Sequence, residues 1–337
     1  MAGAGSAASG RASAIYLLKG GPAMGQPGLM QAKIQQADLK RRKHMREIPL
    51  HLMLIPGIVI VVIFCYIPIL GLVMGFQRFI PAKGIFGSPW VGLGNFKYLI
   101  NLPGTFQVLY NTVFIATMKI VAGIVAPVSV ALLLNEVRFS PFKRTVQTVI
   151  YMPYFHSWII LSGVVIDILS PSQGIVGQFL SSIGIKPVFF LADEGWFPFI
   201  MVITDVWKHF GFGTIVYLAA LTGIDPTYYE AALIDGAGRW KQTLHITLPG
   251  IAPIVMLMTT LALGNVLNAG FDQIFNLYSP AVYRTGDIID TMIYRMGIVD
   301  AQFGVATAMG IFRSVVSFIF VSGSYFLAYR LTGYRVF

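Results

Sequence analysis

Long apolar runs separated by polar loops dominate this chain of 337 residues. An apolar run of about 20 residues can cross the hydrocarbon core of a bilayer as a helix. The pattern predicts an all-α, polytopic membrane protein with about six transmembrane helices in residues 48–337, behind an N-terminal tail at residues 1–47. The predicted spans are residues 50–77, 108–135, 146–169, 197–223, 249–272 and 304–331.

Composition supports a lipid bilayer as the environment of the chain. Hydrophobic residues make up 56% of the chain and charged residues 11%, and mean hydropathy is +0.72. The net charge of +10 does not indicate a nucleic-acid partner, because the basic residues gather at predicted membrane edges instead of forming a stripe with interleaved aromatics. The single cysteine, Cys65, lies in an apolar run, which excludes a disulfide framework or a cysteine metal cluster within the chain.

The distribution of basic residues predicts the orientation. Fifteen lysines and arginines lie before the first span, in the second and fourth loops and after the last span, whereas six lie in the other loops. Positive loops stay in the cytoplasm, so both termini are predicted to be cytoplasmic. The first thirty or so residues of the tail are rich in Gly, Ala and Ser, and we expect the tail to be partly disordered.

A polar island interrupts the apolar pattern at residues 225–249. Asp225 is a good N-cap and Pro226 suits the first helical position, so a short helix is predicted as far as about Asp235, ended by Gly236 or Gly238. The island contains Glu230-Ala231-Ala232-Leu233-Ile234-Asp235-Gly236-Ala237, followed by Ile246-Thr247-Leu248-Pro249.

This pattern resembles the EAA loop of ABC-importer permeases. The resemblance implies a coupling helix that sits in a cleft of a cytoplasmic ATPase subunit, with Glu230, Ala231, Ala232, Asp235 and Gly236 as the ATPase-coupling residues. The remaining motifs are similar to the polysaccharide-type (LplB-like) branch of the carbohydrate-uptake class, which is related to the maltose-transporter permease. They are Met152-Pro153-Tyr154-Phe155-His156-Ser157-Trp158, Tyr217-Leu218-Ala219-Ala220-Leu221, Phe271-Asp272-Gln273-Ile274-Phe275-Asn276-Leu277 and Asp287-Ile288-Ile289-Asp290-Thr291.

The resemblance implies a type I ABC importer permease fold in the bacterial cytoplasmic (inner) membrane. It also implies a saccharide substrate, a second homologous permease subunit, two cytoplasmic ATPase subunits and an extracytoplasmic solute-binding protein. The chain has no Gly-x-x-x-x-Gly-Lys-Ser/Thr phosphate loop, so ATP and Mg are expected on the partner ATPase subunits and no cofactor or metal on this chain. The expected mechanism is alternating access, and we expect a transporter subunit without catalytic residues, not an enzyme.

Ionisable side chains inside the predicted spans indicate a substrate pathway. Each costs about 2.5–3.5 kcal/mol at the bilayer centre on the insertion scale, so such groups normally face protein or water. Asp205, Lys208, His209 and Phe212 follow the i, i+3, i+4, i+7 spacing and share one helical face. Hydrogen-bonding groups beside aromatic rings suit a sugar, and an internal Asp205–Lys208 ion pair is the alternative interpretation.

Four further residues are candidates for the same pathway: Asn265, Asn268, Trp158 and Arg313. The two amides could also bridge helices, Trp158 could belong to an aromatic belt, and Arg313, like Lys119, is a lone cation that could tether two helices. If Lys208 and Arg313 both faced the pathway, an acidic, alginate-type oligosaccharide would be favoured. The outer loops at 78–107 and 273–303, with Trp90, Tyr278, Tyr283 and Asp287, are predicted docking surfaces for the binding protein.

Two other classes of function would require different features in the sequence. A membrane-embedded glycan-processing enzyme would need paired carboxylates or a metal cluster, and Asp287 with Asp290 is a close acidic pair in the outer loops. An ion-driven secondary transporter of a polar solute would need carboxylates at the midplane and two repeated halves. Asp167 and Asp205 lie inside predicted spans, but no convincing repeat accompanies them.

Overall fold

The computed structural model describes residue 49 and residues 51–264 and 266–332. The predicted tail at 1–47 and Asn265 therefore lie outside the described residues. The part of the chain that the structure describes is helical and contains one isolated bridge, between Gln77 and Trp90, so the predicted all-α class is confirmed. Two compact units divide the chain at Leu70, and the residues discussed below belong to the second, residues 71–337.

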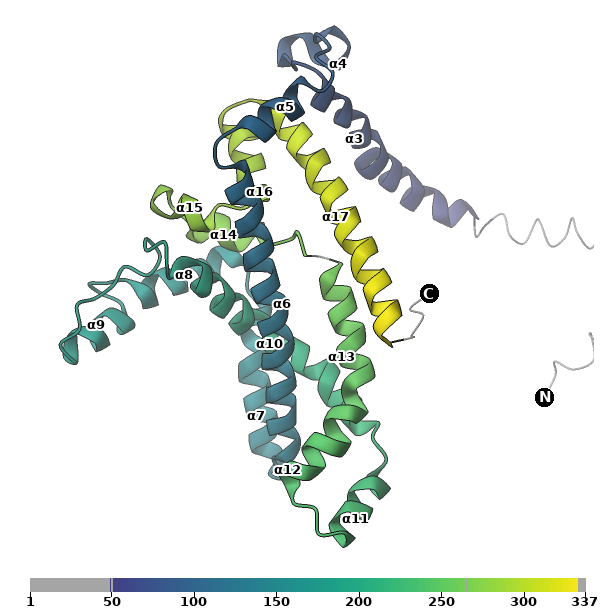
Figure 1. The fold of residues 1–337 in the computed structure, drawn as a ribbon, viewed down its shortest axis with the longest axis vertical. Coiled ribbons are helices and arrows are strands. Elements are labelled where there is room, and N and C mark those ends of the chain that lie inside the picture. The colour runs from purple at the N-terminus through teal and green to yellow at the C-terminus, as the bar shows by residue number, and fades with distance from the viewer. Residues whose placement is uncertain (1–48, 50, 265, 333–337) are drawn as a thin grey trace, which may run out of the picture. The chain divides into compact units, whose positions relative to one another are not determined.

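The helices follow one another without strands between them (Figure 1). Up to residue 182 they are η1 (Val62–Tyr66), α3 (Ile67–Ile69), η2 (Leu70–Phe76), η3 (Pro81–Lys83), α4 (Gly84–Gly87), α5 (Gly94–Asn101), α6 (Thr105–Glu136), α7 (Ser140–Tyr151), η4 (Met152–Phe155), α8 (Trp158–Leu169) and α9 (Ile175–Ser182). From residue 197 they are α10 (Phe197–Thr222), α11 (Pro226–Ile234), α12 (Arg239–Gln242), η5 (Thr243–Thr247), α13 (Leu248–Leu263), α14 (Phe271–Leu277), η6 (Pro280–Val282), α15 (Tyr283–Gly286), α16 (Ile289–Tyr294), η7 (Arg295–Val299) and α17 (Phe303–Thr332).

Five helices in the described residues are long and apolar enough to cross a membrane, or six if a bent pair counts as one span. This number agrees with the predicted six. The five straight helices are His51–Phe76, Thr105–Glu136, Phe197–Thr222, Arg239–Leu263 and Phe303–Gly323.

The predicted span at 146–169 is sharply bent in the structure. Helices Ser140–Phe155 and Trp158–Leu169 meet at 108°. Pro153 lacks an N–H donor, and the chain turns into extended backbone at His156 and Ser157 before α8 begins. The 12 residues of α8 would reach only about 18 Å, which is shorter than the roughly 30 Å hydrocarbon core.

The predicted fifth span at 249–272 is wrong at both ends. The helix begins at Arg239 and passes through Pro249 directly after a π-helical turn, so this proline does not mark the helix start that its type favours. It ends at Leu263, and helix resumes only at Phe271, after Gly270 has adopted a left-handed φ of +91°. An irregular segment thus separates α13 from α14.

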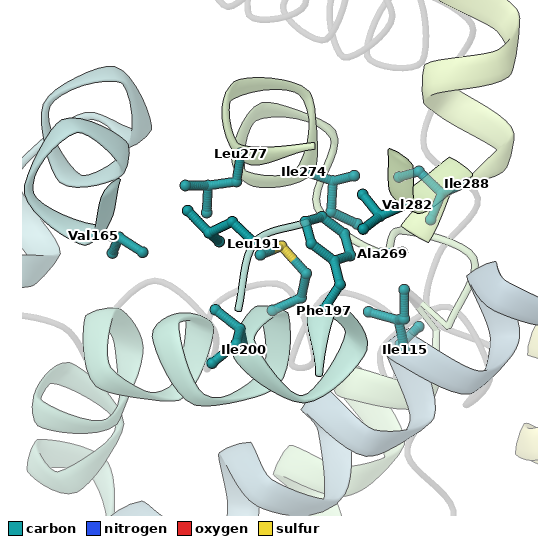
Figure 2. Close-up of a cluster of buried hydrophobic side chains, with 12 residues drawn as sticks. Ile115, Val165, Leu191, Phe197, Ile200, Ala269, Ile274, Leu277, Val282 and Ile288 are labelled. Atoms are coloured by element: carbon teal, nitrogen blue, oxygen red, sulfur yellow. The ribbon is translucent and has the colours of Figure 1, made fainter. Parts of the chain in front are cut away.

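The hydrophobic core of the second unit is gathered around α6. One cluster, drawn in Figure 2, packs Phe197 at the start of α10 against Ile115 of α6 and Ile274 of α14, all with no exposed surface. A second cluster includes Val108 of α6, and a third includes Ala131. α6 contributes to all three clusters, and α10, α13, α15 and α16 pack directly against it.

Candidate functional site

Lys119 of α6 is the centre of a buried polar cluster. Its ammonium lies 3.4 Å from the Asp205 carboxylate of α10. The same group donates to the backbone oxygen of Ala269 at 2.7 Å and to the side-chain oxygen of Gln273. Lys119 therefore bridges helices, as one of its predicted roles expects, although spacing along the chain gave no signal of its partners.

Gln273 completes this cluster from α14. The side chain is fully buried, and its amide nitrogen donates to the Met201 backbone oxygen at 2.8 Å and to the Thr204 hydroxyl at 2.7 Å. A buried amide with partners on both ends is stabilising, whereas an unpaired one would be costly. We call Lys119, Asp205, Gln273 and Thr204 the Lys119 cluster; it ties α6, α10 and the segment before α14 together.

A cavity of about 280 Å³ adjoins this cluster. Asp205 and Asn268, both predicted pathway residues, lie on its wall together with Lys119. The remaining lining residues are Ala116, Ile120, Gly123, Ile124, Tyr217, Met258, Ala262, Ala269 and Gly270. The wall is mostly apolar with a few converging polar groups, as is common for small-ligand sites.

Aromatic rings from η4, α8 and α10 form a second surface beside the cluster. Tyr154 stacks on Phe212 with ring centroids 4.4 Å apart and planes 7° apart. His209 lies 6.0 Å from the Tyr154 ring and 6.3 Å from the Trp158 ring. We call Tyr154, Trp158, His209 and Phe212 the aromatic surface. Tyr154 was not predicted as a site residue, although it lies in the motif at residues 152–158.

Lys208 lies behind the aromatic surface. Its ammonium is 4.9 Å from the centroid of the Trp158 ring and donates to the backbone oxygen of His156. The residue is only 8% exposed, whereas His209 is 44% exposed and Phe212 46% exposed. The alternative of an Asp205–Lys208 ion pair is wrong, because Asp205 pairs with Lys119 and His209.

Asp205 connects the two surfaces. One carboxylate oxygen lies 3.4 Å from Lys119, and the other lies 3.5 Å from the Nδ1 atom of His209. The predicted helical face at 205, 208, 209 and 212 is therefore divided, with Asp205 on the cavity wall and His209 and Phe212 on the aromatic surface. Neither Lys208 nor Trp158 lines the 280 Å³ cavity.

Arg313 of α17 also has a partner on another helix, as expected if it tethers two helices. Its Nη1 atom lies 2.6 Å from the Asp290 carboxylate of α16. Burial raises the pKa of the Asp290 carboxyl, and the positive charge of Arg313 opposes that shift.

The outer loops contain a second buried ion pair, between Asp287 and Arg295, at 2.5 Å. Asp287 is only 3% exposed, so its prediction as a docking residue is wrong: the carboxylate is used internally. Burial lowers the pKa of the Arg295 guanidinium, but the hydrogen bond and charge of Asp287 outweigh this and raise it. Burial, reinforced by Tyr283, raises the pKa of Tyr278 to about 12. Trp90 is 64% exposed and remains available to a partner.

The predicted EAA helix is present as α11. The Asp225 carboxylate accepts a hydrogen bond from the Thr227 backbone N–H at 2.9 Å, which holds the pKa of that carboxyl below its usual value. At the other end, the Gly236 and Ala237 N–H groups donate to the Leu233 and Ala232 oxygens, at 3.1 and 2.8 Å. This pairing is a Schellman motif, and Gly236 supplies the left-handed φ of +75° that it needs.

α11 exposes large apolar side chains. Tyr228, Leu233 and Ile234 are 62%, 65% and 88% exposed, and Glu230, Ala231 and Asp235 are exposed beside them, with Ala232 half-buried. In Figure 1, α11 lies at the lower end of α13, far from α14 and α16. A hydrogen bond of 3.0 Å between the Tyr229 and Thr247 hydroxyls ties it to η5. Neighbouring exposed apolar groups of this kind mark a surface for a protein partner.

Within the described residues, no group of three or more His, Cys, Asp or Glu side chains is arranged to hold a metal ion.

Comparison with known proteins places the chain in a family. Residues 98–333 match the family model of the binding-protein-dependent transport system inner membrane component. Protein LplB of Bacillus subtilis (strain 168) is 38% identical over 292 residues, which cover 87% of this chain and 90% of that protein. The polygalacturonan/rhamnogalacturonan transport system permease protein YteP of the same organism is 38% identical over 272 residues, covering 81% and 85%.

Solved structures agree with this assignment. A chain of a bacterial ABC transporter involved in the import of the acidic polysaccharide alginate matches with a TM-score of 0.79 and 38% identity, over 86% of this chain and 98% of that one. A chain of a bacterial alginate ABC transporter, in complex with an alginate pentasaccharide-bound periplasmic protein, matches with a TM-score of 0.79 and 37% identity, over 88% and 99%. The chain therefore belongs to the family of binding-protein-dependent transport system inner membrane components and is a multi-pass, non-enzymatic permease subunit of an ABC transporter.

Proposed function

We propose that this permease serves an ATP-driven importer of acidic oligosaccharides and that its aromatic surface, with Lys208 behind it, contacts the sugar. The main support is that the four rings of the aromatic surface are partly exposed and that the Lys208 ammonium lies 4.9 Å from the centroid of one of them, Trp158. A sugar ring presents C–H groups on its faces and hydroxyl groups at its edges. Aromatic faces suit the former, and His209 with Asp205 suits the latter.

The preference for an acidic sugar rests on Lys208. Its ammonium has three N–H donors and uses one on the His156 backbone oxygen. Asp205 does not neutralise it within ion-pair distance, because that carboxylate pairs with Lys119. A positive charge of this kind beside the aromatic surface favours a carboxylated sugar over a neutral one. The relatives named for alginate and for polygalacturonan/rhamnogalacturonan transport support the same substrate class.

The proposed transporter has several subunits. A second, homologous permease faces the aromatic surface, and a solute-binding protein docks on the outer loops and delivers the saccharide. Two ATPase subunits, which bind ATP and Mg, receive α11 in a groove that covers Tyr228, Leu233 and Ile234. With both termini and α11 on the cytoplasmic side, the exposed α11 lies where such subunits can reach it.

The proposed mechanism is alternating access. ATP binding closes the ATPase subunits, and α11 moves with them. Because α11 is bonded to η5 through Tyr229 and Thr247, and η5 continues directly into α13, the motion reaches the wall of the 280 Å³ cavity. The two permeases then rock as rigid bodies and expose the sugar site to either side in turn.

The test is uptake into proteoliposomes by the complete transporter, with an acidic and a neutral oligosaccharide of equal length. Lys208→Gln should reduce uptake of the acidic sugar by about tenfold or more, the loss of one charge-assisted interaction, and leave any neutral uptake within about threefold. Lys186→Gln, at an exposed lysine between α9 and α10 and outside the predicted docking loops, is the matched control. Equal losses for both sugars, or no loss, would contradict the assignment of Lys208.

A further inference from the structure

A second and larger cavity lies between α14, α16, η7 and α17. Its volume is about 700 Å³, within the usual range for small-ligand sites. Asp290, Arg313, Phe271 and Tyr294 are on its wall, with Asn268 at its border to the smaller cavity. The aromatic surface does not contribute to it, so this cavity is distinct from the sugar contact proposed above.

The polar wall of this cavity is the Arg313–Asp290 pair. Arg313 contacts Asp290 through Nη1 at 2.6 Å and donates from Nη2 to the Leu267 backbone oxygen at 3.4 Å. A guanidinium carries five N–H donors, so these two contacts leave donors for a ligand. The two side chains are 31% and 14% exposed, which keeps the pair accessible but partly shielded from water. Arg313 can thus bind a carboxylate while Asp290 accepts from a hydroxyl.

The aromatic wall contains two rings. The Phe271 and Tyr294 centroids lie 5.7 Å apart with planes at 48°, and Phe275 packs on the edge of Tyr294 at 4.7 Å. Phe275 thus supports a ring that lines the cavity without lining it itself. The aromatic wall lies beside the Asp290 carboxylate and the Arg313 guanidinium, which can donate two parallel hydrogen bonds to a carboxylate. This combination suits a carboxylated sugar ring.

The two cavities are neighbours, because Asn268 lies on the wall of both. Asp205, on the wall of the smaller cavity, lies 3.5 Å from His209 of the aromatic surface, so a ligand of several rings can extend from that surface along the smaller cavity into the larger one. Resting on the proposed function, we propose that the 700 Å³ cavity is a second saccharide subsite, in which Arg313 and Asp290 bind a uronic acid ring of a longer oligosaccharide. This subsite makes the permease selective for chain length as well as for charge.

The test compares kcat/KM for uptake of an acidic disaccharide and an acidic tetrasaccharide by the complete transporter. Arg313→Gln should lower the value for the tetrasaccharide by about tenfold or more, as expected from one charge-assisted hydrogen bond. The disaccharide, held at the aromatic surface, should change less than about threefold. The double variant Asp290→Asn/Arg313→Gln has two neutral amides that can still pair, so it leaves no unpaired charge. It replaces the single variant in the comparison of the two substrates if Arg313→Gln does not insert into the membrane.

Lys186→Gln, at an exposed lysine between α9 and α10, controls for loss of one positive charge outside both cavities. The second subsite would be overturned if the double variant inserts and kcat/KM falls equally for the disaccharide and the tetrasaccharide, or falls for neither. If the wild-type transporter imports no acidic oligosaccharide of either length, the proposed function fails instead, and the two outcomes are distinguishable.

Discussion

The Lys119 cluster and α11 differ in the burial of their side chains and in whether those side chains have partners within the chain. Lys119 is 8% exposed and is bonded to oxygens of Asp205, Ala269 and Gln273 within the chain. Ile234 of α11 is 88% exposed, although it is one of the most apolar residue types. The cluster is complete within one polypeptide, whereas the apolar side chains of α11 are exposed in it and are covered by an ATPase subunit in the transporter proposed above. The comparison separates what holds this permease together from what connects it to its partners.

The largest expected effect comes from breaking the cluster. Lys119→Met would leave the Asp205 carboxylate without its main partner, and we expect the free energy of unfolding in detergent to fall by about 3–5 kcal/mol. Lys119→Met/Asp205→Leu should recover part of this loss, because the double change removes the unpaired charge. Lys97→Met, at an exposed lysine, is the control. Equal stability of wild type and Lys119→Met in denaturant titration would show that the cluster does not support the fold.

The next effect comes from distorting α11. Gly236 has a φ of +75° and donates its N–H to Leu233. Proline can neither adopt a positive φ nor donate an N–H, so Gly236→Pro should change the path of the chain at the end of α11. We expect uptake to fall on the order of 100-fold, as for other functional groups that are moved out of position. Folding and insertion should stay intact, since α11 has no buried residues. Gly238→Ala, where an added Cβ would meet open space, should retain uptake. Coupled uptake at the wild-type rate in Gly236→Pro would refute a coupling role.

A smaller effect is expected at the aromatic surface. Phe212→Leu keeps an apolar side chain but removes the ring that stacks on Tyr154 at 4.4 Å. Aromatic pairs contribute about 0.5–1.5 kcal/mol beyond their buried area, so the KM for saccharide uptake should rise about two- to tenfold, with kcat little changed. Phe212→Tyr should restore most of the affinity. A fall in kcat at constant KM would assign the ring to a conformational step instead.

The smallest effect concerns the cap of α11. Its hydrogen bond from Thr227 lowers the pKa of Asp225 in the folded state, so the cap stabilises α11 above the unfolded pKa and is lost as pH falls through the folded pKa. Amide hydrogen exchange in α11, corrected for intrinsic rates, should therefore increase below pH of about 4. Asp225→Asn, which keeps a capping oxygen, should show no such pH step, and Asp225→Ala should exchange fast at every pH. An identical pH profile for Asp225→Asn and wild type would exclude this carboxyl as its cause.

The two regions also differ in how far the sequence reveals them. α11 is local: Asp225, Pro226 and Gly236 lie within twelve positions and specify the start and end of the helix by themselves. The Lys119 cluster joins residues 86 and 154 positions from Lys119, and apolar periodicity gives no information on which helices meet. Gln273 was not predicted as a site residue, because a single amide just after a predicted span forms no pattern with other residues that would mark it as a partner of Lys119.

The corrected spans have a similar cause. A proline such as Pro153 favours a bend, but the size of this bend depends on the extended backbone at His156 and Ser157, which hydropathy does not report. Gly264 and Gly270 allowed a break in the fifth span, and the Ala269 oxygen that this break frees accepts from Lys119, a partner on α6. This hydrogen bond lies on the wall of the 280 Å³ cavity and joins residues 150 positions apart, so no local pattern in the sequence could indicate it.

The coupling role of α11 is tested most directly by the ATPase activity of the affinity-purified complex in mild detergent. We expect the tagged chain to copurify with a sister permease and ATPase subunits, and a binding protein loaded with an acidic oligosaccharide to stimulate hydrolysis. Glu230→Lys, on the exposed face of α11, should abolish that stimulation. Stimulation that persists unchanged in an intact Glu230→Lys complex, or a chain that purifies without any ATPase, would contradict the account.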